Sequence, residues 1–441
     1  MDWLKASAAE QGRAFLAGLL SPVEQAEAYL DAIHRHPYGP QIYARLTPSR
    51  AQAEAIAAHD RAKAGLRRGL LDGVALSWKD NINSAGIATE AGSALLAKRT
   101  PAQDATTLAN VTMQGLVCLG KTHMTELAFS GLGLNPVTAT PPNAYDPALA
   151  PGGSSSGAAV SVALGLAAAA IGSDTGGSIR LPAAWNGVVG FKPTHGAVSS
   201  DGVVPLCASF DVLGPIARTV EDCAEIFALL RGESAADLTG AEARGLRLLV
   251  LEGVPFDQAR EGPVTAFEDA VRRLSQAGAR ITHGTLPSVA KAMALATTLF
   301  APEAYATWRD QIEDAPELMY PPILQRFRGG KDTLATDFIA GWQEMRRLRA
   351  EWASAVAGFD AVILPTSPIT PPDVARLLAE PEYFTAENLL ALRNTRIGNM
   401  LGLPAISLPT GHPACGLMLM GAAGRDRALL RAAAGAEAAL A

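Results

Sequence analysis

The sequence predicts an α/β fold in which helices cover both faces of a mixed or parallel sheet. Short apolar runs alternate with helix-forming stretches over residues 71–126, and the pattern restarts at residue 246. Strand–helix–strand alternation is typical of such sheets. Hydrophobic residues make up 49% of the 441 residues and charged residues 18%, so the chain can bury a large core. Length alone would allow two or three domains, or one large domain with an insertion.

The net charge, the apolar runs and the cysteine spacing argue against several classes of protein. The net charge is −6 and no long basic run is present, which argues against a nucleic-acid binder. The longest apolar run, residues 158–171, is too short to span a bilayer, and the first residues do not resemble a signal peptide. The four cysteines lack C-x-x-C spacing, so we expect reduced thiols in a cytoplasmic protein. The histidines form no metal motif, so neither a metal nor a cofactor is expected.

The first 65 residues are expected to form a helical cover. Ser21, Pro22 and Glu24 have the pattern of an N-cap, a first-turn proline and an N3 acid, which marks a helix start. A second, alanine-rich helix is expected over residues 49–65.

A short apolar strand is expected next, over residues 74–80, and Lys79 stands at its far end. A surface lysine at a strand end is the ordinary interpretation of such a segment alone. Its apolar neighbours Leu76 and Trp78 also make Lys79 a candidate buried lysine.

The remaining elements follow from the same patterns. The expected segments are a helix over 106–114, a strand over 115–120, a helix opening at 121–126, loops over 131–151 and 211–218, a helix from 219, a strand over 246–251, a helix over 267–276, a strand over 281–286, a long helical section over 289–358, strands over 360–365, 403–409 and 417–420, and a helix over 428–440. The loop at 211–218 carries an exposed-looking arginine. The aromatic-bearing section 289–358 is a candidate lid or substrate-pocket wall, although ordinary helix packing explains each single aromatic residue.

Residues 152–180, GGSSSGAAVSVALGLAAAAIGSDTGGSIR, are the most informative stretch. Ser154 and Ser178 lie in Gly/Ser turns at its two ends, and the uncharged middle, residues 158–170, predicts a buried helix. Glycines allow backbone N–H groups to approach a ligand closely. Two serines, exposed donors and a rigid frame are what an acyl-transfer site needs.

Three other interpretations of this stretch fit less well. A flexible linker would not enclose a long apolar run. A phosphate-binding loop needs a lysine that neither turn carries. The G-x-S-x-G elbow of α/β-hydrolases needs a second glycine, which is missing from Gly-Gly-Ser-Ile-Arg at residues 176–180.

Several motifs match one known family. They are Gly-Gly-Ser-Ser-Ser-Gly at 152–157, Asp-Thr-Gly-Gly-Ser-Ile-Arg-Leu-Pro-Ala at 174–183, Lys-Asp-Asn at 79–81, and the segments 120–122, 190–194, 211–218 and 399–409. The chain therefore resembles the amidase signature family of serine hydrolases. The agreement covers nearly the whole chain, so a single domain over residues 1–441 is expected, with a cover at 1–65, a catalytic core at 66–230 and a C-terminal part at 231–441.

The resemblance implies a Ser-cis-Ser-Lys triad and a large mixed, twisted sheet of about eleven strands with helices on both faces. By position, Ser178 would be the nucleophile, Ser154 the bridging serine and Lys79 the base. The implied oxyanion hole consists of the backbone amides of Thr175, Gly176, Gly177 and Ser178. The implied supporting residues are Ser155, Asp174 and Arg180. Lysine can act as the base only if burial lowers its pKa toward the working pH.

The implied activity is hydrolysis of carboxamides through an acyl-enzyme on Ser178, with aryl esters and carbamates (urethanes) as further substrates. The alternative is the A subunit of a glutamyl-tRNA(Gln) amidotransferase, which works with partner chains. That protein usually continues its signature with Ala-Phe-Cys-Gly, whereas residues 184–187 read Ala-Trp-Asn-Gly, which favours an autonomous amidase. Allophanate hydrolase is not expected, because that enzyme usually carries an additional C-terminal domain.

The expected partner is a small-molecule amide, ester or carbamate, with no nucleic acid and no membrane, and a homodimer is one expected assembly. Substrate selectivity is expected in the loop 124–135 and the helices near 300–345. The candidate substrate contacts are Met124, Phe129, Gly131, Tyr305 and Trp308. Their aromatic members, together with Phe300 and Tyr320, indicate an apolar or aromatic acyl group.

Overall fold

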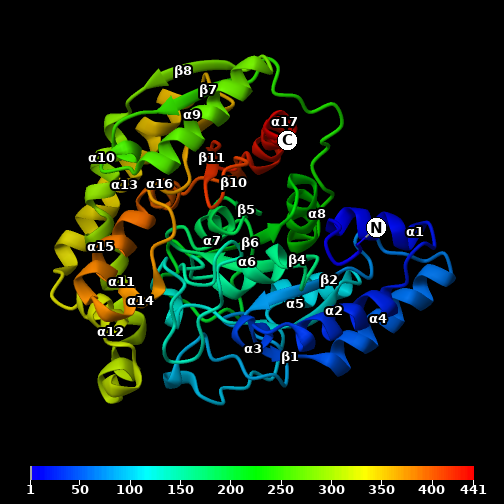
Figure 1. The fold of residues 1–441 in the computed structure, drawn as a ribbon. Helices are drawn as coiled ribbons and strands as arrows, with labels where there is room; N and C mark the ends of the chain where they lie inside the picture. Colours follow the sequence, from blue (N-terminus) through cyan, green and yellow to red (C-terminus); the bar gives the residue numbers. More distant parts are fainter. Residues whose placement is uncertain (1) are drawn as a thin grey trace.

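A twisted sheet of eleven strands runs through the computed structural model, which describes residues 2–441 (Figure 1). The strands are β1 (Tyr43–Leu46), β2 (Ala75–Lys79), β3 (Val117–Thr122), β4 (Ala169–Asp174), β5 (Val189–Lys192), β6 (Val212–Ala217), β7 (Arg247–Leu251), β8 (Arg280–Gly284), β9 (Ala361–Pro365), β10 (Ala405–Pro409) and β11 (Gly416–Met420). Their order in the sheet is β1-β3-β2-β4-β6-β5-β10-β11-β9-β7-β8.

The sheet is mixed. Strands β3, β2 and β4 run parallel near one end, and β9, β7 and β8 run parallel at the other. The strands between them pair antiparallel, as does the edge strand β1 with β3. The predicted mixed sheet of about eleven strands is therefore confirmed.

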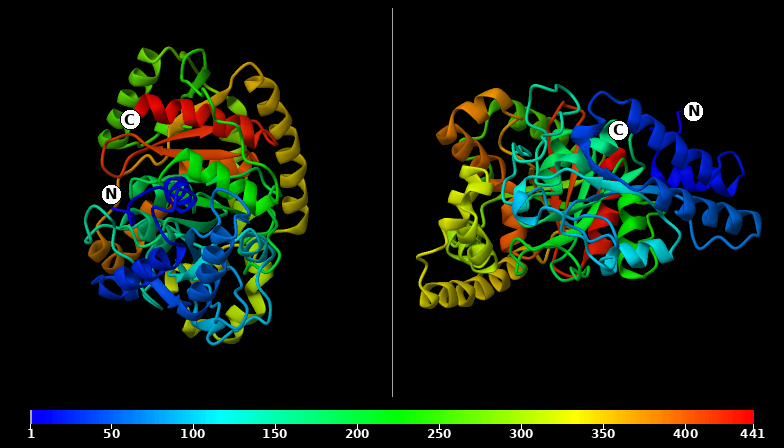
Figure 2. Two further views of the ribbon diagram at one scale, coloured as in Figure 1. Left: turned by 90° about the vertical axis from the view of Figure 1, so that its right-hand side faces the viewer. Right: turned by 90° about the horizontal axis from the view of Figure 1, so that it is seen from below.

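Helices cover both faces of the sheet. They are α1 (Ala8–Leu16), α2 (Pro22–Arg35), α3 (Gly39–Ile42), α4 (Pro48–Lys63), α5 (Thr106–Met113), α6 (Ser156–Ala163), α7 (Arg180–Trp185), α8 (Val220–Arg231), α9 (Glu261–Gln276), α10 (Pro287–Ala294), α11 (Ala296–Asp314), α12 (Pro321–Arg328), α13 (Ala335–Val356), α14 (Val374–Ala379), α15 (Pro381–Ala391), α16 (Arg393–Met400) and α17 (Asp426–Leu440). The N-terminal helices α2 and α4 and the helices α11 to α13 lie at opposite ends of the molecule (Figure 2).

Side chains of the strands alternate between two hydrophobic cores, as the period of two in a strand requires. In β11, Leu417 and Leu419 belong to the core shared with α8, α9 and α17, whereas Met418 and Met420 belong to the core shared with α10, α11 and α13. The sheet is thus buried on both sides, which explains the near-continuous apolar runs of its strands.

The predicted helix over residues 158–170 is wrong in its extent. Helix α6 ends at Ala163, and Gly165 adopts a left-handed conformation with φ of 74°, which is a common helix termination. The chain then enters strand β4 at Ala169, where small side chains lie between neighbouring strands and helices. The segment is buried except at the half-buried Ala163 and Leu164, and it is a helix followed by a strand.

Three other expectations also differ from the structure. The helix expected to open at 121–126 does not start there, because Lys121 and Thr122 end β3 and pair with β2, and only a short 3-10 helix follows at Glu126–Ala128. The helical cover at 1–65 also contains β1. The loop expected at 211–218 is strand β6, in which Gly214 and Pro215 still pair along β4, although both residues ordinarily argue against a strand.

Arg218, which looked exposed from the sequence, links the N-terminus to the turn between α6 and β4. Its guanidinium donates to five backbone carbonyl oxygens at 2.7–3.3 Å, those of Leu4, Ala6, Val162, Ala167 and Ala168. Hydrogen bonds from charged donors are among the stronger ones in proteins.

We predict that Arg218→Ala lowers the free energy of unfolding by about 3 kcal/mol or more, because several carbonyls lose a charged donor. Chemical denaturation measures this change. Arg309→Ala is the matched control, since Arg309 is exposed and pairs with exposed Asp310, and it should change stability by no more than about 0.5 kcal/mol. Equal small effects of both substitutions would contradict the prediction.

Candidate active site

Lys79 is fully buried at the end of β2. Its Nζ atom lies 2.7 Å from Ser154 Oγ, 2.8 Å from Ser173 Oγ and 3.2 Å from the Ser173 carbonyl oxygen. Burial lowers the pKa of Lys79 to about 7, against the opposing influence of the Asp174 and Asp211 carboxylates. A substantial fraction of this amine is therefore neutral at neutral pH and can accept a proton.

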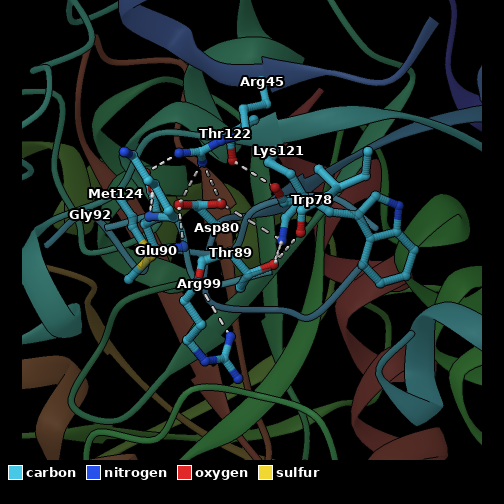
Figure 3. Close-up of polar contacts among 12 residues, drawn as sticks. Arg45, Trp78, Asp80, Thr89, Glu90, Gly92, Arg99, Lys121, Thr122 and Met124 are labelled. Atoms are coloured by element: carbon cyan, nitrogen blue, oxygen red, sulfur yellow. Dashed lines mark hydrogen bonds and ion pairs between the residues drawn. The ribbon is translucent and has the colours of Figure 1, made fainter. Parts of the chain in front are cut away.

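Asp80, the next residue, lies in a separate polar cluster (Figure 3). Its carboxylate lies 3.7 Å from Lys121 Nζ and 3.4 Å from the Arg45 guanidinium, and it accepts a hydrogen bond of 3.1 Å from the Glu90 amide. Arg45 also pairs with the Glu90 carboxylate. This cluster holds the chain directly after Lys79 and leaves the Lys79 amine to the two serines.

Ser154 lies in the first Gly/Ser turn, directly before α6, and its side chain is buried. The peptide bond between Gly153 and Ser154 is cis. The Gly153 amide donates to the Gly131 carbonyl at 2.7 Å, and the Ser154 carbonyl accepts from the Thr125 amide at 3.1 Å. Gly131, predicted as a substrate contact, thus holds the backbone beside Ser154.

Ser178 lies in the second Gly/Ser turn, between β4 and α7, and is 4% exposed. Its carbonyl accepts a hydrogen bond of 3.2 Å from the Ser155 amide, so the two Gly/Ser turns are in direct contact. The structure therefore brings together the two serine turns and the lysine that the sequence singled out.

The backbone amides before Ser178 divide into two groups. The Gly177 amide donates to Asp174 Oδ1 at 2.8 Å, so it is engaged and differs from the free donor that the sequence led us to expect. Within residues 2–441, the amides of Thr175, Gly176 and Ser178 have no intramolecular acceptor. These three amides are available to a ligand oxygen.

Asp174 and Arg180 form a fully buried ion pair beneath this turn, with 2.9 Å between Arg180 Nη2 and Asp174 Oδ1. Asp174 also accepts from the Ile179 amide at 3.0 Å and from Asn399 Nδ2 at 2.8 Å. Burial alone would raise the pKa of Asp174, but the charge and hydrogen bonds of Arg180 bring it down to about 2. The carboxylate is thus ionised and fixes the shape of the turn.

Some residues around the site were not singled out from the sequence. Ser173 contacts Lys79 and also accepts a hydrogen bond of 3.0 Å from Asn81 Nδ2, and its carbonyl accepts one of 3.1 Å from Ser155 Oγ. Ser173 directly precedes the matched motif at 174–183, Asn81 is the last residue of the motif at 79–81, and Asn399 begins a matched segment. Their position in these motifs, or directly before one, is the signal that could have identified them.

A small cavity of about 190 Å³ opens at Ser178. Its floor includes Thr175 and Gly176, and Phe129 and Phe300 belong to its apolar walls. Ligand pockets commonly measure about 300–1,000 Å³, so this cavity suits a small substrate.

The predicted substrate contacts are only partly at this cavity. Phe129 lines it, whereas the lining within the described part of the chain does not include Met124, Tyr305 or Trp308. Met124 is fully buried. The Tyr305 hydroxyl donates to Glu313 at 3.2 Å, and the Trp308 indole N–H donates to the Pro205 carbonyl at 2.9 Å. These two aromatic residues therefore stabilise the helical section rather than face the cavity.

Arg326 and Arg396 also line the cavity and were not singled out from the sequence. Each belongs to a helix that carries other charged residues, such as Arg328 in α12 and Arg393 in α16. Arginines in such helices are usually solvated, so sequence alone gave no sign that these two converge on Ser178.

Comparison with known proteins identifies the family. The sequence model of the family described as Amidase matches residues 24–430. The chain belongs to the amidase signature family. Enzymes of this family hydrolyse C–N bonds, so hydrolytic C–N cleavage is the supported class of activity for this amidase-family chain.

Three similar proteins illustrate the family. A 2-amino-5-chloromuconic acid deaminase from Comamonas testosteroni is 34% identical, over 88% of this chain and 86% of the relative. The A subunit of the glutamyl-tRNA(Gln) amidotransferase from Natronomonas pharaonis is 33% identical, over 82% of this chain and 95% of the relative. The crystal structure of a peptide amidase from Stenotrophomonas maltophilia superposes with a TM-score of 0.82 at 28% identity, covering 99% and 97% of the two chains.

Residues 2–441 contain no helix with the length and apolar character that a membrane span requires. Within the same range, His, Cys, Asp and Glu side chains do not gather in groups of three or more that could hold a metal ion.

The Asp174–Arg180 pair generates a stability prediction. We expect Arg180→Leu to lower the free energy of unfolding by about 3–5 kcal/mol, because the Asp174 carboxylate would stay buried without its partner. Adding Asp174→Asn should recover part of that loss. A double-mutant cycle by chemical denaturation measures the interaction energy between Asp174 and Arg180.

The exposed Arg376–Glu380 pair is the control for this cycle. Its disruption by Arg376→Ala should cost no more than about 1 kcal/mol. Strictly additive effects of the Asp174 and Arg180 substitutions would show that the buried pair does not act as a unit.

Proposed function

We propose that this protein is an autonomous amidase that hydrolyses small carboxamides through an acyl-enzyme on Ser178. The observation that carries the proposal is the 2.7 Å contact between buried Lys79 Nζ and Ser154 Oγ, next to the cavity at which Ser178 lies. A serine hydroxyl becomes a competent nucleophile only when a nearby base removes its proton. Neutral Lys79 is suited to be that base, with Ser154 as the bridge.

In the acylation step, Ser178 Oγ attacks the amide carbonyl carbon. The Ser178 proton passes to Ser154 Oγ while the Ser154 proton passes to Lys79 Nζ, which becomes an ammonium. The carbonyl oxygen becomes an oxyanion, and the free amides of Thr175, Gly176 and Ser178 are the donors for it. In other serine hydrolases one such donor contributes about 3–4 kcal/mol to transition-state stabilisation.

Collapse of the tetrahedral intermediate breaks the C–N bond. The leaving nitrogen takes a proton back from Lys79 through Ser154, and an amine or ammonia departs, which leaves an ester on Ser178. Water then attacks this ester and delivers its proton through the same relay. Ser178 is restored and the carboxylic acid is released, so one amide and one water give one carboxylate and one amine. Esters and carbamates can acylate Ser178 by the same steps.

The alternative activity is that of an amidotransferase component working with partner chains. Relatives with that name match most of the chain, so family membership alone does not separate the two. The Comamonas relative, named a deaminase of an acid, and the peptide amidase support C–N hydrolysis of a free small molecule. We therefore propose the autonomous amidase as the first assignment.

Turnover by the isolated protein tests this proposal. A panel of an aliphatic amide, a carboxylate-bearing amide, an aryl amide, an anilide carbamate and a p-nitrophenyl ester should contain at least one substrate. Ser178→Ala should lower its turnover at least about a thousandfold with unchanged far-ultraviolet circular dichroism, and Lys79→Ala should do the same.

Ser161→Ala is the matched control, since Ser161 is a buried serine of α6 that bonds Ser77 away from the cavity. It should retain activity within about tenfold. Activity of Ser178→Ala or Lys79→Ala within tenfold of wild type would refute the triad. Ammonia release from glutamine only in the presence of partner chains and mischarged tRNA would favour the amidotransferase.

The pH dependence of kcat/KM tests the role of Lys79. The base must be neutral to accept a proton, so activity should be low in acid and rise to a plateau with an apparent pKa near 7. Steady-state rates between about pH 5 and pH 9, on a substrate without ionisable groups, measure this rise of kcat/KM with pH. A flat profile, or one that falls as the pH rises through 7, would contradict the assignment.

A further inference from the structure

The cavity at Ser178 contains two arginines and no acidic side chain. Arg326 lies in the last turn of α12 and Arg396 in α16, and both line the cavity. Within the described residues, neither guanidinium forms an ion pair with a carboxylate, and Arg326 Nε is buried without a hydrogen-bond partner. Arg180, beneath the same turn, is paired with the buried Asp174 carboxylate, whereas these two arginines at the cavity have no such partner among the described residues.

Arg396 lies next to the reacting centre. Its Nε atom is 3.9 Å from the point that a Cβ atom on Gly176 would occupy, and Gly176 contributes one of the free amides before Ser178. A group held by Arg396 would therefore lie close to an acyl carbon bonded to Ser178.

Arg326 is held in place by aromatic packing. Its Cζ atom lies 4.7 Å from the centre of the Phe129 ring, a distance at which cation–π attraction is effective. Phe129 in turn packs edge-on against Phe327 at 4.6 Å between ring centres. The guanidinium is thus oriented before any ligand arrives.

The charge of the two arginines is not compensated. Burial lowers the pKa of Arg326 to about 9 and that of Arg396 to about 10, and repulsion by Arg396 adds to the effect at Arg326. Both pKa values remain above neutral pH, so both side chains are cationic. Cations facing a largely apolar cavity are costly without an anion, and guanidinium groups match the planar geometry of a carboxylate.

We propose that the substrate is an amide whose acyl part carries a carboxylate, which binds between Arg326 and Arg396. This inference rests on the proposed function and names its substrate class: monoamides of small dicarboxylic acids, which hydrolysis converts to the dicarboxylate and ammonia. The carboxylate replaces the purely apolar or aromatic acyl group that the sequence led us to expect. Phe129 and Phe300 then contact the carbon chain between the two functional groups.

The absence of acidic residues from the described cavity lining also predicts which anions are poor substrates. Glutamine carries an ammonium group beside its carboxylate, and that cation would face two arginines without a counter-charge. Glutamine should therefore react more slowly than glutaramate, which has the same chain without the amino group.

Matched substrate pairs test the proposal in the hydrolysis reaction. We expect kcat/KM for succinamate, glutaramate or adipamate to exceed that for the neutral analogues butyramide, pentanamide or hexanamide by at least about a hundredfold. Arg326→Gln and Arg396→Gln should each lower kcat/KM for the carboxylated amide at least about tenfold more than kcat/KM for its neutral analogue. Arg326→Lys and Arg396→Lys should restore part of the preference.

Arg328→Gln is the control, because Arg328 lies on the same helix and pairs with Glu313 at the surface, and it should keep the wild-type preference. If the wild type hydrolyses both members of a pair equally, the proposal is wrong. If Arg396→Gln slows neutral and carboxylated amides equally, Arg396 acts on the oxyanion and is not a carboxylate anchor.

Binding of the products separates this inference from the proposed function. Calorimetric titration of Ser178→Ala with succinate, glutarate and adipate needs no turnover. We expect saturable binding of at least one dicarboxylate, weakened at least about tenfold by adding Arg326→Gln. Binding without amide hydrolysis by the wild type would overturn the proposed function and uphold the anion site. Hydrolysis without binding or carboxylate preference would overturn the anion site alone.

Discussion

The buried contact of Lys79 with Ser154 and Ser173 is the interaction on which the rest of the site depends. An amine without a carboxylate in contact, enclosed at the end of a central strand, loses much of its preference for the charged form. Its Nζ atom donates hydrogen bonds to serine oxygens, which stabilise the ammonium less than an ion pair would. The sheet enforces this arrangement, because β2 pairs with β4 and β4 carries Ser173. The lysine can therefore act as a base near neutral pH without another titrating group.

The second Gly/Ser turn depends on α16, a helix far along the chain. Thr395 accepts a hydrogen bond from Arg180 at its carbonyl and donates from Oγ1 to the Gly176 carbonyl, at 2.7 and 2.8 Å. Asn399 of the same helix contacts both Asp174 and Arg180. Arg396 lies on this helix too and faces the cavity. One helix thus positions the turn that carries Ser178 and supplies one of the charges that we propose for substrate selection.

The sequence predicted features that depend on local interactions better than features that depend on contacts between distant parts of the chain. The helix start at Ser21 was predicted correctly, and the Ser21 hydroxyl accepts a hydrogen bond from the Val23 amide. Most strands with apolar runs were also predicted correctly. The juxtaposition of Lys79 with Ser154 was expected from the family resemblance. The single helix over 158–170 was wrong, because helix propensity is a weak preference, and the pairing of Ala169–Asp174 with β2 and β6 overrides it.

The substrate pocket was the least predictable part. Trp308 and Tyr305 looked like pocket aromatics, but their polar atoms are bound within the protein. Arg326 and Arg396 come from different helices, and only the tertiary packing of α12 and α16 brings both to Ser178. A local pattern contains no information about which arginines will lack a carboxylate partner, so long-range geometry was needed.

The most direct test of the central claim is to label the protein with a serine-directed sulfonyl fluoride at neutral pH and map the adduct by peptide mass spectrometry. The account predicts one stoichiometric adduct on Ser178 in the wild type, formed far more slowly when Lys79 is replaced by alanine. Modification of a different residue, or equal labelling of Ser178 with and without Lys79, would show that the buried lysine does not activate this serine.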